Sequence, residues 1–488
     1  MTLPSGQQLT RAAFFSLAFI LAARIFAMSL LPLTDPTEGR YAQVAQEMLI
    51  TGDWITPRIW MNETHLPFQG KPPLYFWAAA EAMNILGEHE FAARLPSLLA
   101  AIAFLFLLYH VMQRYGGVKD AGLLGVMATV SCGFFVALSG SVAVDMVFST
   151  CVAGSLIAYF AFICEPDRQN RRRWSLLVFI LLALGFLTKG PVAIVLFGLP
   201  VLVWTIRWRD WHRLRDHRWI VGTLLFLIIV APWFILCEMR NQGFLKYFFI
   251  NENLLRFVTH DYGDAYGSGH IYPRGSALLM FLAASAPWSL LGLWRLIRRK
   301  SGFREDCLSD PRTNFLFLGF AAGTLFWCLA RQLLFTYLLP MVPLFAAWVV
   351  LTTRTDANRK RLLAASAVLV TATAVVSTVC VPCMRNVNTT REIVNVARRL
   401  DYDKQSREPL VFERKTPYSA LFYARGWVIP HPKEPIQESL RRYADKERSA
   451  LVVVEARRKK ELSKLTSGCW SELASTGEWV LGRVLFRN

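Results

Sequence analysis

Residues 219–237 of this chain read WIVGTLLFLIIVAPWFILC, a run without a single charged side chain. An apolar helix of about twenty residues spans the hydrocarbon core of a bilayer. Comparable runs recur along the 488 residues, of which 54% are hydrophobic and 13% aromatic. The sequence therefore predicts an all-α polytopic membrane protein and excludes an ordinary soluble enzyme.

The apolar runs predict about eleven membrane helices, or up to thirteen if shorter segments also cross. They cover residues 12–31, 91–112, 121–138, 143–163, 175–187, 191–206, 219–237, 276–294, 313–330, 337–351 and 361–382. The shorter apolar segment 74–86 is a candidate re-entrant or interfacial helix. Residues 12–31 are either a signal peptide or an uncleaved anchor, and Arg24 inside the run favours the anchor.

Basic residues predict the orientation, because Lys and Arg accumulate in cytoplasmic loops. With the N-terminus inside, the basic clusters fall in the predicted inner loops. They include Arg114, Lys119, Arg168, Arg171 to Arg173, Arg207, Arg209, Arg213, Arg215, Arg218, Arg295, Arg298, Arg299, Lys300, Arg354, Arg359, Lys360 and Arg361. The net charge of +19 is thus explained by topology and by contact with anionic membrane lipids, and no nucleic acid need be invoked.

The composition divides the chain into a transmembrane domain, residues 1–383, and a small soluble α/β domain, residues 384–488. Strands are predicted at 409–413, 450–455 and 479–486, and helices at 434–446 and 457–464. An odd number of spans places this domain outside, with the outer loops 32–90 and 238–275. Cys380 and Cys383 are read as a disulfide or as inert packing, because a zinc site needs a second pair.

On this topology the unusual polar residues all lie on the outer side. They are Asp35, Glu38, Arg40, Tyr41 and Lys71 in the first outer loop, Asp145, Lys189, Glu252, Arg256 and Tyr337. A cation near the hydrocarbon boundary is costly unless an anion pairs with it, so Lys71, Lys189 and Arg256 suit a lipid phosphate. Asp35 and Asp145 would face a hydroxyl awaiting deprotonation or a substrate amine.

Each of these residues also has a structural interpretation. Arg256 could snorkel to the interface, and Asp145 could cap its helix. Glu38 could be a first-turn charge, and Tyr337 a belt aromatic. His260, Asp261 and Asp264 suggest a metal, but their spacing matches no closed site.

Several motifs occur in order along residues 12–350. They are Asp35-Pro-Thr-Glu-Gly-Arg-Tyr-Ala, Lys71-Pro-Pro-Leu-Tyr, Ser-Val-Ala-Val-Asp145, Phe186-Leu-Thr-Lys189-Gly-Pro, Glu252-Asn-Leu-Leu-Arg256-Phe and Thr336-Tyr337-Leu-Leu-Pro. Together they resemble the lipid A aminoarabinose transferases, and more broadly the GT-C glycosyltransferases that include protein O-mannosyltransferases.

The resemblance implies transfer of a sugar, such as 4-amino-4-deoxy-arabinose, from a polyprenyl (undecaprenyl) phosphate carrier to lipid A. It also implies a bacterial inner membrane location with a periplasmic active site and periplasmic C-terminal domain. By motif, Lys71, Lys189, Arg256 and Tyr337 would bind the carrier phosphate. Asp35 and Asp145 would be catalytic, and Glu38, Arg40, Tyr41 and Glu252 would line the substrate cavity.

The match departs from the family at two positions. Gly70 stands where the aminoarabinose transferases carry an acidic residue, and Asn253 where they carry a histidine. Both positions would belong to a metal site in that family, so the resemblance predicts no metal and no other cofactor here. The identity of the sugar stays open.

Other functions remain as alternatives. A related transferase could modify a protein, a polysaccharide or another glycan. A lipid-carrier flippase would bind the same phosphate without chemistry, but such proteins tend to have ionisable groups near the midplane and paired, interrupted helices, and the sequence has neither. A membrane sensor with an outer domain would leave the outer lysines unexplained.

Overall fold

The structure is a computed structural model of the chain. It describes residues 5–61, 64–259, 266, 270–298, 310–353, 355–384, 387–400, 408–425, 427–429, 449–460 and 470–485. The predicted metal-type residues His260, Asp261 and Asp264 and the predicted helix 434–446 lie outside these residues.

The chain forms two compact units. The first contains residues 1–26, 69–75 and 95–378, and the second contains residues 27–68, 76–94 and 379–488. The sequence placed the domain boundary after residue 383. In the structure most of the first predicted outer loop belongs to the same unit as the C-terminal residues, which composition alone does not indicate.

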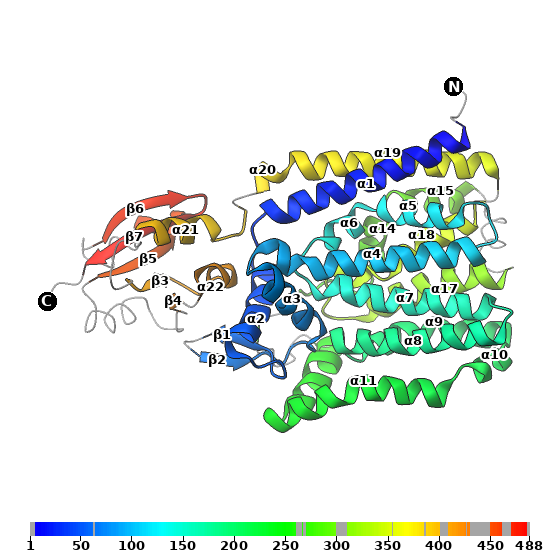
Figure 1. Cartoon of the computed structure of the whole chain (residues 1–488), viewed down its shortest axis with the longest axis horizontal. Helices are drawn as coiled ribbons and strands as arrows, with labels where there is room; N and C mark the ends of the chain where they lie inside the picture. The colour runs from blue at the N-terminus through cyan, green and yellow to red at the C-terminus, as the bar shows by residue number, and fades with distance from the viewer. Residues whose placement is uncertain are drawn as a thin grey trace. The chain divides into compact units, whose positions relative to one another are not determined.

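The first unit is built from helices that lie side by side (Figure 1). Its helices are α1 (Gly6–Leu30, to residue 26), α4 (Glu90–Tyr115, from residue 95), α5 (Ala121–Val130), α6 (Gly133–Ser139), α7 (Val144–Cys164), α8 (Arg168–Lys189), α9 (Val192–Trp208), α10 (Trp211–Asp216), α11 (Trp219–Arg240), α12 (Phe244–Lys246), η1 (Tyr247–Leu255), α13 (Arg256–Val258), α14 (Ser276–Ala284), α15 (Trp288–Arg298), α17 (Pro311–Leu329), η2 (Phe335–Leu338), α18 (Met341–Leu351) and α19 (Asp356–Val379). Every predicted apolar run contains a helix.

The number of complete spans is smaller when length and hydropathy are applied to the described helices. Five, α1, α4, α7, α11 and α19, are long and apolar enough to cross a membrane. The count rises to seven if the bent pairs α5 with α6 and α14 with α15 each form one span. Helix α8 differs from its prediction because it starts with arginines, so its apolar part is short. The chain is a multi-pass membrane protein.

Helix α7 is the centre of the first unit. In its most apolar 18-residue stretch, 89% of the residues are buried, whereas in that of α11 only 28% are buried. It packs against α8, α9, α17 and α18. A helix that is apolar on all sides is stable in such an interior position. The packing around α7 therefore fixes the positions of the residues at its two ends.

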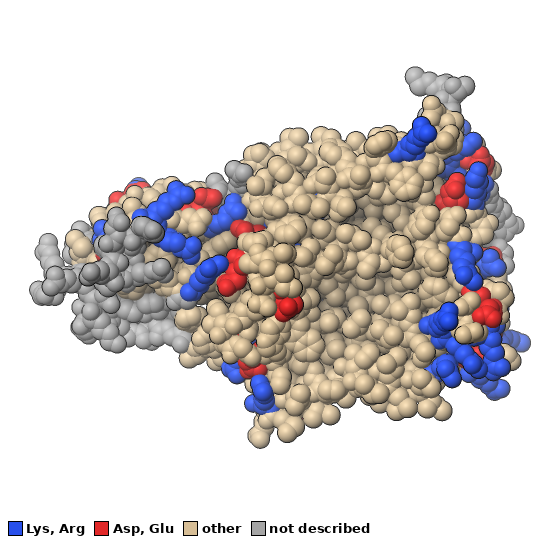
Figure 2. Space-filling view, viewed as in Figure 1, with Lys and Arg blue, Asp and Glu red and all other residues tan. Residues whose placement is uncertain are grey.

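The two ends of the helical unit differ in charge. Lys and Arg side chains gather at the end where α10 lies (Figure 2). Arg171, near the start of α8, forms an ion pair of 3.0 Å with Asp216 of α10, so α8 begins at this end. Helix α8 has 22 residues and is therefore about 33 Å long, at about 1.5 Å per residue. Lys189, at its last position, thus lies about a membrane thickness from the arginines at its start.

The second unit combines short helices with two sheets. It contains α2 (Thr37–Thr51), the antiparallel hairpin of β1 (Arg58–Met61) and β2 (Thr64–Pro67), α3 (Leu74–Leu86, from residue 76), α20 (Val381–Met384), α21 (Arg391–Leu400), β3 (Leu410–Phe412), α22 (Tyr418–Ala424), β4 (Val428–Ile429), β5 (Ser449–Glu455), η3 (Ala456–Arg458), β6 (Trp470–Thr476) and β7 (Trp479–Leu485). The predicted segment 74–86 is a helix with those bounds.

The C-terminal sheet has the strand order β4-β3-β5-β7-β6. Strand β3 is parallel to β4 and β5, while β7 is antiparallel to β5 and β6. Three of these strands, β3, β5 and β7, confirm the predicted ones, whereas β4 and β6 were not predicted. The predicted helix 457–464 begins as the short 3₁₀ turn η3, and residues after 460 lie outside the described part.

Candidate active site

Asp145 and Lys189 form a buried ion pair within the first unit. Lys189 Nζ lies 2.6 Å from Asp145 Oδ1, and both side chains are less than 10% exposed. Asp145 is in the first turn of α7, and Lys189 ends α8, which packs antiparallel beside it. Each charge therefore also has the sign that its helix end favours. Asp145 contacts Lys189 but is not among the residues that line the cavity described below.

The turn after Lys189 depends on Gly190. Its φ of +83° is unfavourable for residues that carry a Cβ. A Cβ there would also lie 2.7 Å from the ring of Phe248 in η1. The glycine therefore lets the end of α8 and η1 approach closely, which brings the Lys189 motif to the Glu252 motif.

Glu252 joins the two other predicted cations. Its carboxylate accepts a hydrogen bond from Lys71 Nζ and one of 2.5 Å from Arg256 Nη1. Lys71 also donates to the carbonyl of Gly70, and the amide of Gln69 donates to the Tyr266 hydroxyl at 2.9 Å. Lys71 and Glu252 are 181 residues apart in sequence, so this contact is a product of the tertiary fold.

The ionised form of Glu252 is stabilised by these neighbours. Burial alone would raise the pKa of its carboxyl. The positive charges of Lys71 and Arg256, and their hydrogen bonds, outweigh burial and hold the pKa below its usual range. Glu252 lies on the π-helix η1, a geometry found frequently at functional sites. We conclude that Glu252 orders two cations at one place.

Tyr337 contacts one of these charged groups through its ring. Lys189 Nζ lies 3.8 Å from the centroid of the Tyr337 ring, a cation–π geometry. The ring also contacts Trp327, with centroids 4.6 Å apart. Tyr337 is buried, so the ring helps to position Lys189 and does not act as an interfacial belt residue.

A cavity of about 310 Å³ opens between these residues. Its lining includes Lys71, Lys189, Glu252, Arg256 and Tyr337. The remaining lining residues are mostly apolar, among them Val192, Val195, Phe249, Phe257, Phe326 and Trp327. An apolar cavity with a few converging charges is typical of a site for an amphipathic ligand. Lys71, Lys189 and Arg256 thus line one cavity, while their binding of a carrier phosphate stays a prediction.

Two neutral amides also line the cavity. Gln332 is buried and was not singled out from the sequence, since a lone glutamine gives no pattern. Asn253 donates to the carbonyl of Phe248 at 2.8 Å. Among the described residues, no three His, Cys, Asp or Glu side chains gather at one point. The absence of a metal or other cofactor from the reaction stays a prediction.

Asp35 belongs to the second unit, where it contacts the C-terminal segment. Its carboxylate accepts hydrogen bonds from the Ser419 hydroxyl and, at 3.0 Å, from the Ser419 amide. Burial raises the pKa of this carboxyl, and the hydrogen bonds from Ser419 and Tyr418 and the charge of Lys415 oppose that rise. Sequence patterns gave no signal for a partner 384 residues away.

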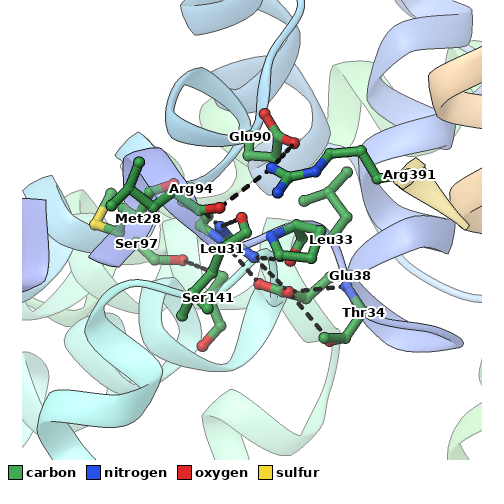
Figure 3. A network of polar contacts seen from close by, with 12 residues as sticks. Met28, Leu31, Leu33, Thr34, Glu38, Glu90, Arg94, Ser97, Ser141 and Arg391 are labelled. Carbon is green, nitrogen blue, oxygen red and sulfur yellow. Dashed lines mark hydrogen bonds and ion pairs between the residues drawn. The ribbon is translucent and has the colours of Figure 1, made fainter. Parts of the chain in front are cut away.

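Glu38 is held by an arginine that the sequence analysis did not single out. Arg94, on α4, binds both Glu38 oxygens, at 3.0 and 2.7 Å (Figure 3). Arg94 also donates to the carbonyls of Met28, Leu31 and Pro32. Arg94 is a charge within a predicted span, and that was the available signal. In the structure Glu38 anchors the chain that follows α1, while its predicted place in the substrate cavity stays a prediction.

Arg40 and Tyr41 lie among aromatic rings of the second unit. The guanidinium of Arg40 is 5.2 Å from the centroid of the Tyr41 ring and 6.0 Å from that of Tyr418. Tyr41 packs edge-on against Phe76 at 5.6 Å. The structure therefore groups Asp35, Glu38, Arg40 and Tyr41 within one unit, and Lys71, Asp145, Lys189, Glu252, Arg256 and Tyr337 within the other.

Sequence comparison connects part of the chain with known transferases. Residues 70–236 match the family described as dolichyl-phosphate-mannose-protein mannosyltransferase. The undecaprenyl phosphate-alpha-4-amino-4-deoxy-L-arabinose arabinosyl transferase of Pseudomonas paraeruginosa is 30% identical over 325 residues, which are 64% of this chain and 56% of the relative. A Pseudomonas fluorescens relative of the same name is 29% identical over 328 residues, 64% of this chain and 52% of the relative. The aligned part thus spans about half the length of these relatives.

Comparison of structures extends the similarity to nearly the whole chain. The crystal structure of ArnT from Cupriavidus metallidurans bound to undecaprenyl phosphate matches with a TM-score of 0.77 and 19% identity, over 96% of this chain and 97% of ArnT. An Archaeoglobus fulgidus oligosaccharyltransferase matches less closely, with a TM-score of 0.51 and 11% identity over 93% and 71% of the two chains. The resemblance predicted from the motifs is confirmed: the chain matches the protein mannosyltransferase family over residues 70–236 and has the ArnT fold.

Proposed function

We propose that this protein is a glycosyltransferase of the bacterial inner membrane that transfers a sugar from a polyprenyl phosphate carrier to lipid A. The observation that supports it most directly is the single cavity lined by Lys71, Lys189 and Arg256. The relatives named above are arabinosyl transferases that use an undecaprenyl phosphate donor, so 4-amino-4-deoxy-arabinose is the proposed sugar.

The charge of the site suits a carrier phosphodiester. The three cations and the carboxylates of Glu252 and Asp145 leave one net positive charge, which matches the single negative charge of the phosphodiester in the donor. During transfer an acceptor oxygen bonds to the anomeric carbon, and the bond to the carrier phosphate breaks. The phosphate leaves with the electron pair. Fixed cations in a water-poor cavity stabilise the charge that develops on its oxygens.

The proposed roles of the carboxylates depend on the acceptor. A lipid A phosphate is already a nucleophile at neutral pH, and then Asp35 would bind the substrate ammonium group. A hydroxyl acceptor must lose a proton, and Asp35 would take it. Asp145 acts on the donor through its ion pair with Lys189. Glu38, Arg40 and Tyr41 would shape the substrate side of the site, as the motif resemblance implies.

We propose that the site faces the periplasm and that the N-terminus is cytoplasmic. The basic end of the helical unit would lie in the cytoplasm, because positively charged segments are retained there (Figure 2). Lys189 lies at the other end of α8. About eleven membrane segments, some of them short or bent, together with outer loops at about 32–90 and 238–275, complete this topology.

The test uses purified protein in lipid nanodiscs with carrier-linked amino sugar and lipid A. Lys71→Ala, Lys189→Ala and Arg256→Ala should each lower the transfer rate about 10²-fold or more. Lys246→Ala, which changes an exposed cation on neighbouring α12, should leave it unchanged. Full activity of the Lys71 variant would contradict the proposal. Unchanged lipid A with an altered surface glycan in a deletion strain would instead identify another acceptor.

A further inference from the structure

The motif that begins at Asp35 contains Gly39, a position at which the structure leaves no room for a side chain. A Cβ on Gly39 would lie 2.6 Å from the amide nitrogen of Ser419 and 2.8 Å from Asp35 Oδ1. Both distances are far below van der Waals contact. Gly39 therefore allows α2 and α22, which pack within the second unit, to meet with the Asp35 carboxylate enclosed between them.

The hydroxyl of Ser419 is oriented by a second neighbour. Ser419 is fully buried, and its Oγ accepts the amide proton of Thr390 at 3.2 Å. The Thr390 hydroxyl lies 2.8 Å from the same oxygen. A carboxylate is a stronger acceptor than a hydroxyl, so the Ser419 proton points to Asp35. Ser419 thus connects the Asp35 carboxylate with the segment that contains Thr390.

We propose that Ser419 is a positioning residue for sugar transfer, through which the C-terminal segment keeps Asp35 ionised and oriented. This inference rests on the proposed function, in which Asp35 acts in its ionised form as a base or as the partner of a substrate ammonium group. It assigns the C-terminal α/β segment a part in the reaction itself.

The electrostatics give this role a measurable consequence. Burial favours the neutral form of Asp35, and the donors from Ser419 and Tyr418 favour the ionised form. Lys415, which precedes α22, acts in the same direction. Arg40, on α2, lies beside Tyr418. Removing the Ser419 hydroxyl removes one stabilising donor, so the pKa of Asp35 should rise.

The experiment compares the pH dependence of kcat/KM for the full chain in nanodiscs, with carrier-linked amino sugar as donor and lipid A as acceptor. Ser419→Ala should move the acidic limb to higher pH by about one unit, the effect of one hydrogen bond to a charged group. At a pH well above this limb its activity should approach that of the wild type. Asp35→Asn should stay inactive throughout.

Ser449→Ala is the matched control. The Ser449 hydroxyl also donates to a carboxylate of the second unit, that of Glu408. This variant should keep the wild-type acidic limb. An unchanged limb in Ser419→Ala, or an equal loss of activity at every pH, would overturn the positioning role. A wild-type protein that transfers no sugar would instead reject the proposed function, so the two failures are separable.

Discussion

At the scale of single residues, the cations of the candidate site are paired with carboxylates before any ligand binds. Glu252 is shared by Lys71 and Arg256, and Asp145 pairs with Lys189. Removing one partner of a buried pair leaves an uncompensated charge, which typically costs about 3–5 kcal/mol. The carboxylates therefore hold the cations in place at the boundary of the hydrocarbon.

We expect Tyr337 to act through the face of its ring. Tyr337→Phe keeps a ring beneath Lys189 and should bind undecaprenyl phosphate nearly as well as the wild type. Tyr337→Leu removes the cation–π contact, worth about 0.5–2 kcal/mol, and should weaken binding about tenfold. Binding can be measured by native mass spectrometry, with exposed Tyr272→Leu as control. Equal losses in the Phe and Leu variants would assign the effect to the hydroxyl.

The depressed pKa of Glu252 predicts a stability that depends on pH. Its folded pKa lies below the unfolded value of about 4.3. The ionised carboxylate thus stabilises the fold at higher pH, and this contribution is lost as the pH falls through the folded pKa. Thermal unfolding between pH 7 and pH 3 should show a wild-type advantage over Glu252→Gln that is largest at pH 7 and disappears in acid.

The control for this experiment is Glu392→Gln, because the Glu392 side chain is about half exposed. Its difference from the wild type should be small at every pH. A constant difference between wild type and Glu252→Gln across the whole range would show that the buried charge of Glu252 does not contribute to stability.

At the scale of elements, helix ends position the site. Helix α7 begins and α8 ends on the same side of the unit, so Asp145 and Lys189 meet. In the second unit, Arg94 satisfies carbonyls at and beyond the end of α1 and binds Glu38 through two hydrogen bonds (Figure 3). Unpaired carbonyls of this kind are costly when they are buried.

Arg94→Ala should therefore destabilise the protein by about 3–5 kcal/mol, because it strands the Glu38 carboxylate and several carbonyls. Arg114→Ala is the matched control on the same helix. Arg114 is half exposed and pairs with Glu165 at 3.0 Å, so its loss should cost less than about 1 kcal/mol. Denaturant or thermal unfolding in detergent measures both. Equal stabilities of the two variants would contradict the structural role of Arg94 and Glu38.

At the scale of the whole molecule, the arrangement of charges predicts the orientation in the membrane. Cys380 and Cys383 are free and exposed after α19, on the side proposed to be periplasmic. A membrane-impermeant maleimide added to spheroplasts should label both, as read by peptide mass spectrometry. A cysteine introduced by Arg172→Cys, in the basic start of α8, should react only after permeabilisation. The reverse pattern would invert the proposed topology.

The local features of this protein were set by the sequence. Hydropathy predicted where helices occur, because a helix that is buried in lipid or in a helix bundle consists of consecutive, mostly apolar residues. The strands β3, β5 and β7 were predicted in the same way. Five of the ten motif residues, Lys71, Lys189, Glu252, Arg256 and Tyr337, line the cavity. The four charged ones among them could be singled out because a charge beside an apolar run is stable at few places in the structure. Strand β4 has only two residues, β6 is mostly polar and has no buried residue, and helix α22 is short, so these elements carry too little pattern to be predicted.

The tertiary structure alone decided which groups meet. Lys71 reaches Glu252 across 181 residues, and Asp35 reaches Ser419 across 384. It also placed the ten predicted site residues in two separate units, and it paired Glu38 with Arg94. Hydropathy is a property of neighbours in sequence, whereas ion pairs and hydrogen bonds depend on the approach of distant segments, which only the packing of the folded chain determines.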